Sequence, residues 1–286
     1  MGVSGLLLLD KEEGWTSQDC AAKLRGILHE RRVGHAGTLD PLATGLLVVL
    51  VGRATRAAAW AEAQEKEYVA AFRPGIDTDT QDITGNLLRR CDVLPSEDMV
   101  REILPRFTGV LSQIPPMYSA IKINGKKLYE VARKGGTVER SPRQITIHSL
   151  EYLRREPNGD HILKIRCSKG TYIRTLCHDI GEALGCGGCM AALRRTASGA
   201  FRVEDAVKIG SVSADTKLLG VDVLFPSAAA LTLSPEQERL LRCGNPFAAR
   251  HSQGEYRFYS TDGSFLALGR ITDGRAVSIK SFFEVG

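Results

Sequence analysis

One aspartate in a glycine-rich segment carries the strongest chemical signal in the chain. Residues 34–45 read Gly-His-Ala-Gly-Thr-Leu-Asp-Pro-Leu-Ala-Thr-Gly, so that Asp40 stands between Gly37 and Pro41. Glycine lets the backbone approach a ligand closely, catalytic residues favour loops held by a rigid scaffold, and proline biases the residue before it toward extended backbone. The segment predicts a reactive carboxylate presented by a loop. Taken alone, it also fits a polar turn before a buried strand.

Apolar runs and helix signals surround this segment. Strands are expected at residues 5–10 and 46–51, and between them a helix capped by Thr16 or Ser17 that runs to about Glu30. The other expected helices span residues 54–65, 97–106, 127–134 and 171–184, and the other expected strands span 66–73, 143–154, 160–168, 255–260, 265–271 and 275–282. This order predicts an α+β fold with a mixed, largely antiparallel sheet and flanking helices.

The chain is expected to form a large domain followed by a small module. Its 286 residues, 43% of them hydrophobic, are enough for about two domains. The composition changes after residue 226, and the Ser-Pro pair at 234–235 offers a boundary. We therefore predict a domain over residues 1–230 and a small β module over residues 231–286.

The net charge of +5 is mild but unevenly distributed. Residues 117–145 hold seven cations and two acids, which is a net charge as large as that of the whole chain. The cations are Lys122, Lys126, Lys127, Arg133, Lys134, Arg140 and Arg143. Clustered cations favour a phosphate-bearing partner whose binding depends on salt. A solvated charged loop is the alternative that the run allows by itself.

Composition excludes several classes of protein. No apolar run approaches the ~20 residues that cross a bilayer, and the N-terminus lacks the basic flank and cleavage site of a signal peptide. Seven scattered cysteines, an odd number, indicate reduced thiols rather than a disulfide framework. These features predict a cytoplasmic protein without membrane attachment.

Two segments invite a metal-binding interpretation that their spacing does not support. Cys186-Gly-Gly-Cys189 is a lone pair, whereas four-ligand zinc sites need a second, well-spaced pair. Asp77, Asp79 and Asp82 lack the glycine and the distal glutamate of an EF-hand. Walker-type and dinucleotide-binding fingerprints are also missing. We therefore predict that no metal and no cofactor are required.

Separated motifs occur in a fixed order along the chain. Beside residues 34–47, they are Lys66-Glu67-Tyr68, residues 75–82 (Gly-Ile-Asp-Thr-Asp-Thr-Gln-Asp), residues 114–130, residues 167–174 (Cys-Ser-Lys-Gly-Thr-Tyr-Ile-Arg) and residues 193–196 (Leu-Arg-Arg-Thr). Together they resemble the TruB-type family of bacterial tRNA pseudouridine synthases over roughly residues 3–225. The resemblance implies the pseudouridine synthase fold, isomerisation of uridine 55 in the T loop of tRNA, and a PUA-like RNA-binding module at the C-terminus.

The same resemblance assigns roles to individual residues. Asp40 matches the essential aspartate, which attacks the sugar, attacks the base or removes a sugar proton, and Arg174 matches its cationic partner, which would keep the pKa of the carboxyl low. Tyr68 matches the tyrosine that stacks on the target base and relays the C5 proton. His35 matches the residue that fills the space left by the flipped-out base. Further substrate contacts are expected from Gly34, Gly37, Leu39, Tyr118, Lys122, Lys126, Lys127, Tyr172 and Leu193.

The basic segment completes this interpretation. Residues 113–142 resemble a flexible insertion that clamps the T loop, so the expected partner is the T stem-loop of tRNA, bound by a monomer with no obligate protein partner. One alternative is a tRNA-binding or folding chaperone in which catalysis is secondary. Another is a guide-RNA-dependent synthase of ribosomal RNA, which ranks lower because such subunits carry extra N-terminal and lysine-rich C-terminal segments that this sequence lacks.

Overall fold

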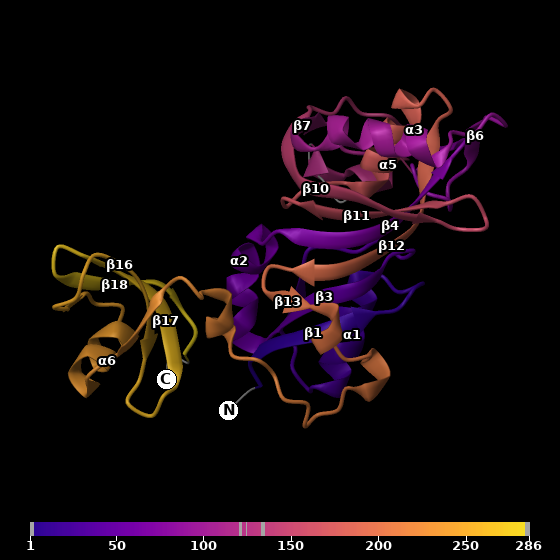
Figure 1. Ribbon diagram of the computed structural model, residues 1–286. Helices are drawn as coiled ribbons and strands as arrows, with labels where there is room; N and C mark the ends of the chain where they lie inside the picture. Colours follow the sequence, from indigo (N-terminus) through magenta and orange to yellow (C-terminus); the bar gives the residue numbers. More distant parts are fainter. Residues whose placement is uncertain (1–2, 120–121, 124, 133–134, 284–286) are drawn as a thin grey trace.

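The chain folds around two β-sheets (Figure 1). The computed structural model describes residues 3–119, 122–123, 125–132 and 135–283. Within these ranges, only the backbone is described for Lys122, Ile123, Lys126, Lys127 and Tyr129. The large sheet contains β1 (Gly5–Lys11), β2 (Val33–Ala36), β3 (Thr44–Val51), β4 (Lys66–Pro74), β7 (Gly109–Gln113), β10 (Arg143–Arg155), β11 (His161–Cys167), β12 (Gly188–Ser198) and β13 (Phe201–Arg202).

Smaller elements flank this sheet. The helices are α1 (Ser17–Ile27), α2 (Ala58–Ala63), α3 (Glu97–Ile103), α4 (Leu128–Ala132), α5 (Ile173–Ala183) and α6 (Pro235–Arg242). Two short hairpins pair β5 (Ile76–Thr78) with β6 (Leu87–Arg90) and β8 (Lys122–Ile123) with β9 (Lys126–Lys127). The second sheet consists of β14 (Ala229–Thr232), β15 (Phe247–Ala248), β16 (Gly254–Tyr259), β17 (Phe265–Thr272) and β18 (Arg275–Ser281).

The large sheet is mixed and largely antiparallel, as the sequence predicts. Its strands follow the order β1-β3-β12-β4-β11-β10-β7, with β2 beside β3 and β13 beside β12. Every neighbouring pair is antiparallel except β3 and β12, which run parallel where Arg194 and Arg195 lie opposite Thr44 and Gly45. This parallel pair brings the strand after the Asp40 segment against a strand about 150 positions further along the chain.

Both faces of β1 and β3 are buried, which explains their uninterrupted apolar runs. Because side chains alternate along a strand, Leu7 and Leu9 face the cluster that includes Leu24 of α1, while Leu6 and Leu8 face the opposite cluster. Helices α1, α3 and α5 contribute to the first cluster, and α2 and β17 contribute to the second. Figure 1 shows the second sheet beside α2.

Two predicted helices shift at their ends for local reasons. Helix α1 begins at a capping box in which Thr16 and Asp19 exchange side chain–backbone hydrogen bonds of 3.0 Å, but it ends at Ile27 and not at Glu30. Helix α5 begins after Tyr172 and not at Thr171. The side chain of Gln113 accepts a hydrogen bond from the Tyr172 amide at 2.8 Å and donates one to its carbonyl at 3.0 Å, which holds this residue in extended backbone.

Other expectations need correction. Residues 52–57 form a 3-10 turn before α2, so the helix expected over 54–65 is shorter. The Ser-Pro pair at 234–235 begins α6, where the Ser234 hydroxyl caps the helix and Pro235 occupies its first turn. The prediction also missed β12, which lies near the centre of the large sheet. Within the described ranges, no helix is long and apolar enough to span a membrane.

Candidate active site

Asp40 lies in the short connection between β2 and β3. The sequence suggests a loop over residues 34–45, but residues 33–36 pair with β3 and form a strand. His35 is therefore a strand residue and not part of a turn. The irregular connection between the two strands spans only residues 37–43, which we call the Asp40 loop.

Two buried polar side chains hold the Asp40 loop through hydrogen bonds to its backbone. The Ser17 hydroxyl, 1% exposed, accepts a hydrogen bond from the Leu39 amide at 2.9 Å and donates one to the Leu39 carbonyl at 3.2 Å. The ammonium group of Lys11, also 1% exposed, lies 3.3 Å from the Pro41 carbonyl, to which it donates. These bonds fix the backbone on both sides of Asp40, while 37% of its side chain stays exposed.

Arg174, in the first turn of α5, connects the Asp40 loop to two other segments. Its Nε lies 2.9 Å from Oδ2 of Asp40, and its Nη1 lies 3.6 Å from Oδ2 of Asp82. The guanidinium also donates to the Thr80 carbonyl at 3.0 Å and to the Tyr118 carbonyl at 2.7 Å. Only 6% of the Arg174 side chain is exposed, so the ion pair with Asp40 is shielded from solvent on the arginine side.

Burial sets the protonation of Asp40 more strongly than its arginine partner does. Displacement of water raises the pKa of the Asp40 carboxyl above its ordinary value of 3.8, and the charge of Asp82 raises it further. Arg174 and Lys11 act in the opposite direction, as expected of nearby cations, without reversing the shift. The expectation of a low pKa is therefore wrong in its net direction, and the Asp40 carboxylate is a stronger base than an ordinary aspartate.

Tyr68 lies on β4, between β11 and β12, and is 8% exposed. Burial raises the pKa of its hydroxyl and Asp40 adds to the increase, while the guanidinium of Arg195 lowers it. Its ring also belongs to the apolar cluster beneath α1 and α5. Tyr68 therefore joins the hydrophobic core and still faces Asp40 closely enough for their charges to interact.

His35 and Gly37 border the Asp40 loop. Burial and the charge of Arg195 lower the pKa of His35, and its Nδ1 is buried without a hydrogen-bond partner among the described residues. A neutral imidazole with one open ring nitrogen therefore stands at the site. Gly37 has φ +76°, and a Cβ there would lie 3.2 Å from Nη1 of Arg195, so the position requires glycine. Gly34 lies beside them in β2.

The other expected contact residues differ in their surroundings. Leu39 and Leu193 are 3% and 9% exposed and belong to the apolar core. Tyr118 and Tyr172 are half-buried. Burial raises the pKa of Tyr172, and the charge of Asp40 contributes to the shift, which places this side chain on the Asp40 side of the site.

The basic insertion is described in part. The side chains of Lys122, Lys126 and Lys127 lie outside the described residues, as do Arg133 and Lys134 altogether. The backbone of the three lysines forms the β8–β9 hairpin, which leads into α4 inside the helix expected over 127–134. At the base of the insertion, the Arg140 side chain donates to the Pro115 carbonyl at 3.0 Å.

Sequence reasoning did not assign three residues that the structure brings to the site. Lys11 supports the Asp40 loop, Asp82 faces Arg174, and Arg195 lies beside Gly37 and Tyr68. Asp82 also accepts hydrogen bonds through Oδ1 from the Thr80 hydroxyl and the Thr84 amide. Asp82 and Arg195 fall in the motifs at residues 75–82 and 193–196, and their place in these motifs was the signal in the sequence that could have identified them.

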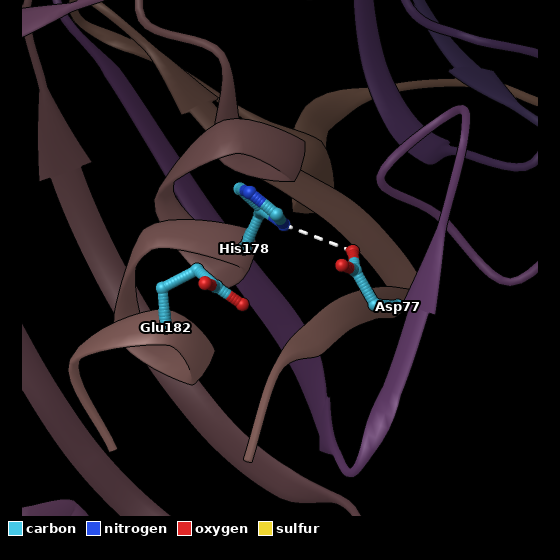
Figure 2. A group of neighbouring side chains, drawn as sticks. All are labelled: Asp77, His178 and Glu182. Atoms are coloured by element: carbon cyan, nitrogen blue, oxygen red, sulfur yellow. Dashed lines mark hydrogen bonds and ion pairs between the residues drawn. The ribbon is translucent and has the colours of Figure 1, made fainter. Parts of the chain in front are cut away.

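One group of side chains has the composition of a metal site (Figure 2). Asp77, His178 and Glu182 offer ligand atoms within 4.8 Å of one another, and Nδ1 of His178 lies 3.1 Å from Oδ1 of Asp77. Arg89 already supplies a cation there, because its Nη2 contacts Glu182 and lies 3.7 Å from Asp77. Asp77 of β5 contacts His178 of α5, and Arg89 of β6 contacts Glu182 of α5. These contacts hold the β5–β6 hairpin against the helix.

The cysteines form no disulfide bonds. All seven are free thiols. Cys186 and Cys189, the pair noted in the sequence, are 5% and 0% exposed, and burial raises the pKa of Cys189 to about 12. A buried thiol with a raised pKa is a poor nucleophile.

Two family models match successive parts of the chain. The N-terminal domain of TruB family pseudouridylate synthase matches residues 25–173, and the C-terminal domain of tRNA pseudouridylate synthase B matches residues 174–225. The chain belongs to the TruB family. The matched ranges contain Asp40, Tyr68 and Arg174, and they confirm the membership that the sequence motifs indicated.

Similar proteins agree with this membership in TruB. A tRNA pseudouridine synthase B of Francisella philomiragia is 38% identical over 99% of this chain and 96% of its own length. Another, of Aromatoleum aromaticum, is 42% identical over 97% of this chain and 92% of its own. A chain of a solved Cbf5-Nop10-Gar1 complex is 26% identical, with a TM-score of 0.72 over 98% of this chain and 85% of that one.

A second solved structure supports the fold alone. A chain of an H/ACA RNP bound to a substrate RNA containing 2'-deoxyuridine is 24% identical, with a TM-score of 0.71 over 98% of this chain and 86% of that chain. The expected pseudouridine synthase fold is therefore confirmed for this TruB-family chain.

Proposed function

We propose that this protein converts uridine to pseudouridine at position 55 in the T loop of tRNA. The observation that carries the proposal is the Asp40 carboxylate, 37% exposed on a firmly held loop and 2.9 Å from the buried guanidinium of Arg174. The reaction breaks the N-glycosidic bond and joins the same sugar carbon to C5 of the base. It needs no oxidant and adds no atoms, so the proposal includes no metal or cofactor.

The side chains divide the chemical work. Asp40 acts at the sugar–base junction, as a nucleophile toward the sugar or the base or as the acceptor of a sugar proton. Arg174 orients it and favours its charged form. Tyr68 stacks on the base and receives the proton that leaves C5. His35 fills the space of the flipped-out base, whose extrusion costs a few kcal/mol.

Two observations favour tRNA modification over the alternatives. Curated relatives of 38% and 42% identity bear the name tRNA pseudouridine synthase B, whereas the solved ribonucleoprotein chains are 24% and 26% identical. The charged pair of Asp40 and Arg174 supports an active enzyme rather than a chaperone alone. The second sheet supports a catalytic domain followed by a PUA-like RNA-binding module, and its first strand, β14 (Ala229–Thr232), favours a boundary just before Ala229, slightly ahead of the predicted division into 1–230 and 231–286. We further infer a cytoplasmic monomer.

The activity is testable with purified components. The protein is incubated with a T stem-loop transcript in the presence of EDTA, and pseudouridine is mapped by chemical sequencing. We expect complete conversion of the single target uridine, and none in a matched transcript with cytidine at that position. Tight binding without conversion would favour the chaperone, and conversion only with an added guide RNA would favour the guide-dependent synthase.

The predicted RNA-binding role of the insertion over residues 113–142, which we call the clamp, is tested separately by the salt dependence of binding. Lys122, Lys126 and Lys127 are changed together to glutamine, and affinity for the stem-loop is measured from low to high salt. If the three lysines neutralise phosphates, affinity falls and the slope of log K against log salt becomes shallower by about 2–3.

A matched triple variant controls for net charge. Lys23, Arg31 and Lys217 are exposed and lie outside the insertion, so their change to glutamine removes the same charge from other surfaces. We expect this control to keep the wild-type slope. An unchanged slope in the clamp variant, or equal slopes in both variants, would contradict the clamp.

A further inference from the structure

Arg195 is the largest fully buried side chain of the described chain, at 1% exposure. It lies on β12, where it pairs with Tyr68 of β4 and with Gly45 of β3. No carboxylate of the described residues lies within ion-pair distance of its guanidinium, which donates to the Leu46 carbonyl at 2.6 Å and to the Gly37 carbonyl at 3.0 Å. A buried charge without a counter-ion is costly, which points to a role beyond packing.

The guanidinium and backbone of Arg195 hold both ends of the Asp40 loop. Gly37 precedes Asp40, and Leu46 follows the loop, so the two hydrogen bonds bracket the carboxylate. The backbones of Gly45 and Arg195 are also in close contact, because a Cβ at Gly45 would lie only 2.3 Å from the Arg195 carbonyl oxygen. Arg195 therefore fixes the loop to β12 at two points.

The positive charge of Arg195 acts on neighbouring groups. It lowers the pKa of Lys66, which burial and this charge together bring to about 8. The charged and titratable groups that shift the pKa of Tyr68 include Arg195 from β12, Cys167 from β11 and Asp40 from the loop. Burial raises the pKa of Cys167 to about 11, which keeps that thiol neutral. Arg195, which lies opposite Tyr68 across β12 and β4, lowers the pKa of this tyrosine through its charge and so offsets part of the effect of burial.

We propose that Arg195 is a positioning residue that couples the Asp40 loop to Tyr68 and stabilises the phenolate form of this tyrosine. The inference rests on the proposed function and deepens it. Once C5 is bonded to the sugar, the C5 proton moves to the phenolate oxygen and the C5–H electron pair becomes the C5=C6 double bond. The N1=C6 pair moves onto N1, which takes one proton from solvent, and Tyr68 later returns its proton to solvent.

The test compares single-turnover rates of three variants on the T stem-loop. Arg195→Gln keeps a hydrogen-bond donor and loses the charge, Arg195→Lys keeps the charge, and Arg194→Met alters the next residue, whose side chain is 41% exposed and pairs with Asp10. At neutral pH we expect the glutamine variant to lose about 100-fold in rate. Its KM should stay within about threefold, and Arg194→Met should retain the wild-type rate.

Two readouts separate this role from a structural one. A phenol without its cation ionises at higher pH, so the rate should rise with pH in both proteins and level off at a higher pH in Arg195→Gln than in the wild type. Proton removal should also limit its rate, so deuterium at C5 of the target uridine should slow it more than the wild type. A rate that levels off at the same pH in both proteins, with an unchanged isotope effect, would overturn the proposal.

The lysine variant and the tyrosine give independent checks. Arg195→Lys should show the pH profile and isotope effect of the wild type, and the same changes as in Arg195→Gln would mean that charge is not the cause and overturn the proposal. Full activity of Tyr68→Phe would also overturn it, while leaving the isomerase function intact. Only a wild-type protein that forms no pseudouridine would refute the proposed function itself.

Discussion

Asp40→Asn is expected to abolish pseudouridine formation, with RNA binding preserved within several-fold. Asparagine keeps the shape of the side chain but can neither attack carbon nor accept a proton. The expected loss is about 10⁴-fold or more, at or beyond the upper end for removal of an acid–base group. Single-turnover conversion of the stem-loop measures the rate, and filter binding measures the affinity.

The Asp40→Asn variant is expected to have a melting temperature equal to or higher than that of the wild type. A carboxyl whose pKa is raised on folding binds its proton more tightly in the folded state, so its ionised form costs stability at neutral pH. A neutral isostere removes this cost. Asp92→Asn is the matched control, because its side chain is 90% exposed and it should change neither activity nor stability. Full activity of Asp40→Asn would refute the assignment.

The raised pKa of Asp40 also predicts a pH dependence. Since the carboxylate is the working form, activity falls as pH drops through the pKa of Asp40 in the protein. The shift is upward from 3.8, so the acid limb of the rate profile should lie above that value. An acid limb at or below 3.8, in a protein that remains folded, would contradict the role of burial at this carboxyl.

Local patterns predicted the elements that depend on neighbours in sequence. The apolar runs identified β1 and β3, and the Thr16–Asp19 spacing located the start of α1. Strand β12 escaped prediction because Arg194 and Arg195 interrupt its apolar character, and its stability comes from partners far along the chain. Arg195 can be buried only because the carbonyls of β3 and the Asp40 loop receive it.

The site shows the same division between local and distant determinants. Asp40 stood out through the glycines and proline around it, but its partner Arg174 is 134 positions away, and only the family resemblance joined the two. The contact between Asp82 and Arg174 depends on how the β5–β6 hairpin packs against α5. The net direction of the pKa shift at Asp40 required the burial of the site, which no spacing of residues reveals.

Arg174→Met is expected to lower the single-turnover rate by about 10²–10³-fold, as removal of a preorganised charge does at other active sites. Asp40 would lose the cation that restrains its pKa, so the acid limb should move to higher pH than in the wild type. Asp82 and the carbonyls of Thr80 and Tyr118 would lose their donor. Breaking the buried pair of Arg174 and Asp82 in this way costs about 3–5 kcal/mol of stability.

The conservative variant separates charge from geometry at Arg174. Lysine keeps the charge but lacks the planar fork, so it cannot reach the two carboxylates and two carbonyls that the guanidinium contacts. Arg174→Lys should therefore keep the acid limb close to the wild-type position while losing part of the rate. Arg154→Met, which removes an exposed arginine paired with Glu156, is the control and should change stability by no more than about 1 kcal/mol. Equal acid limbs in the methionine variant and the wild type would show that Arg174 does not set the charge state of Asp40.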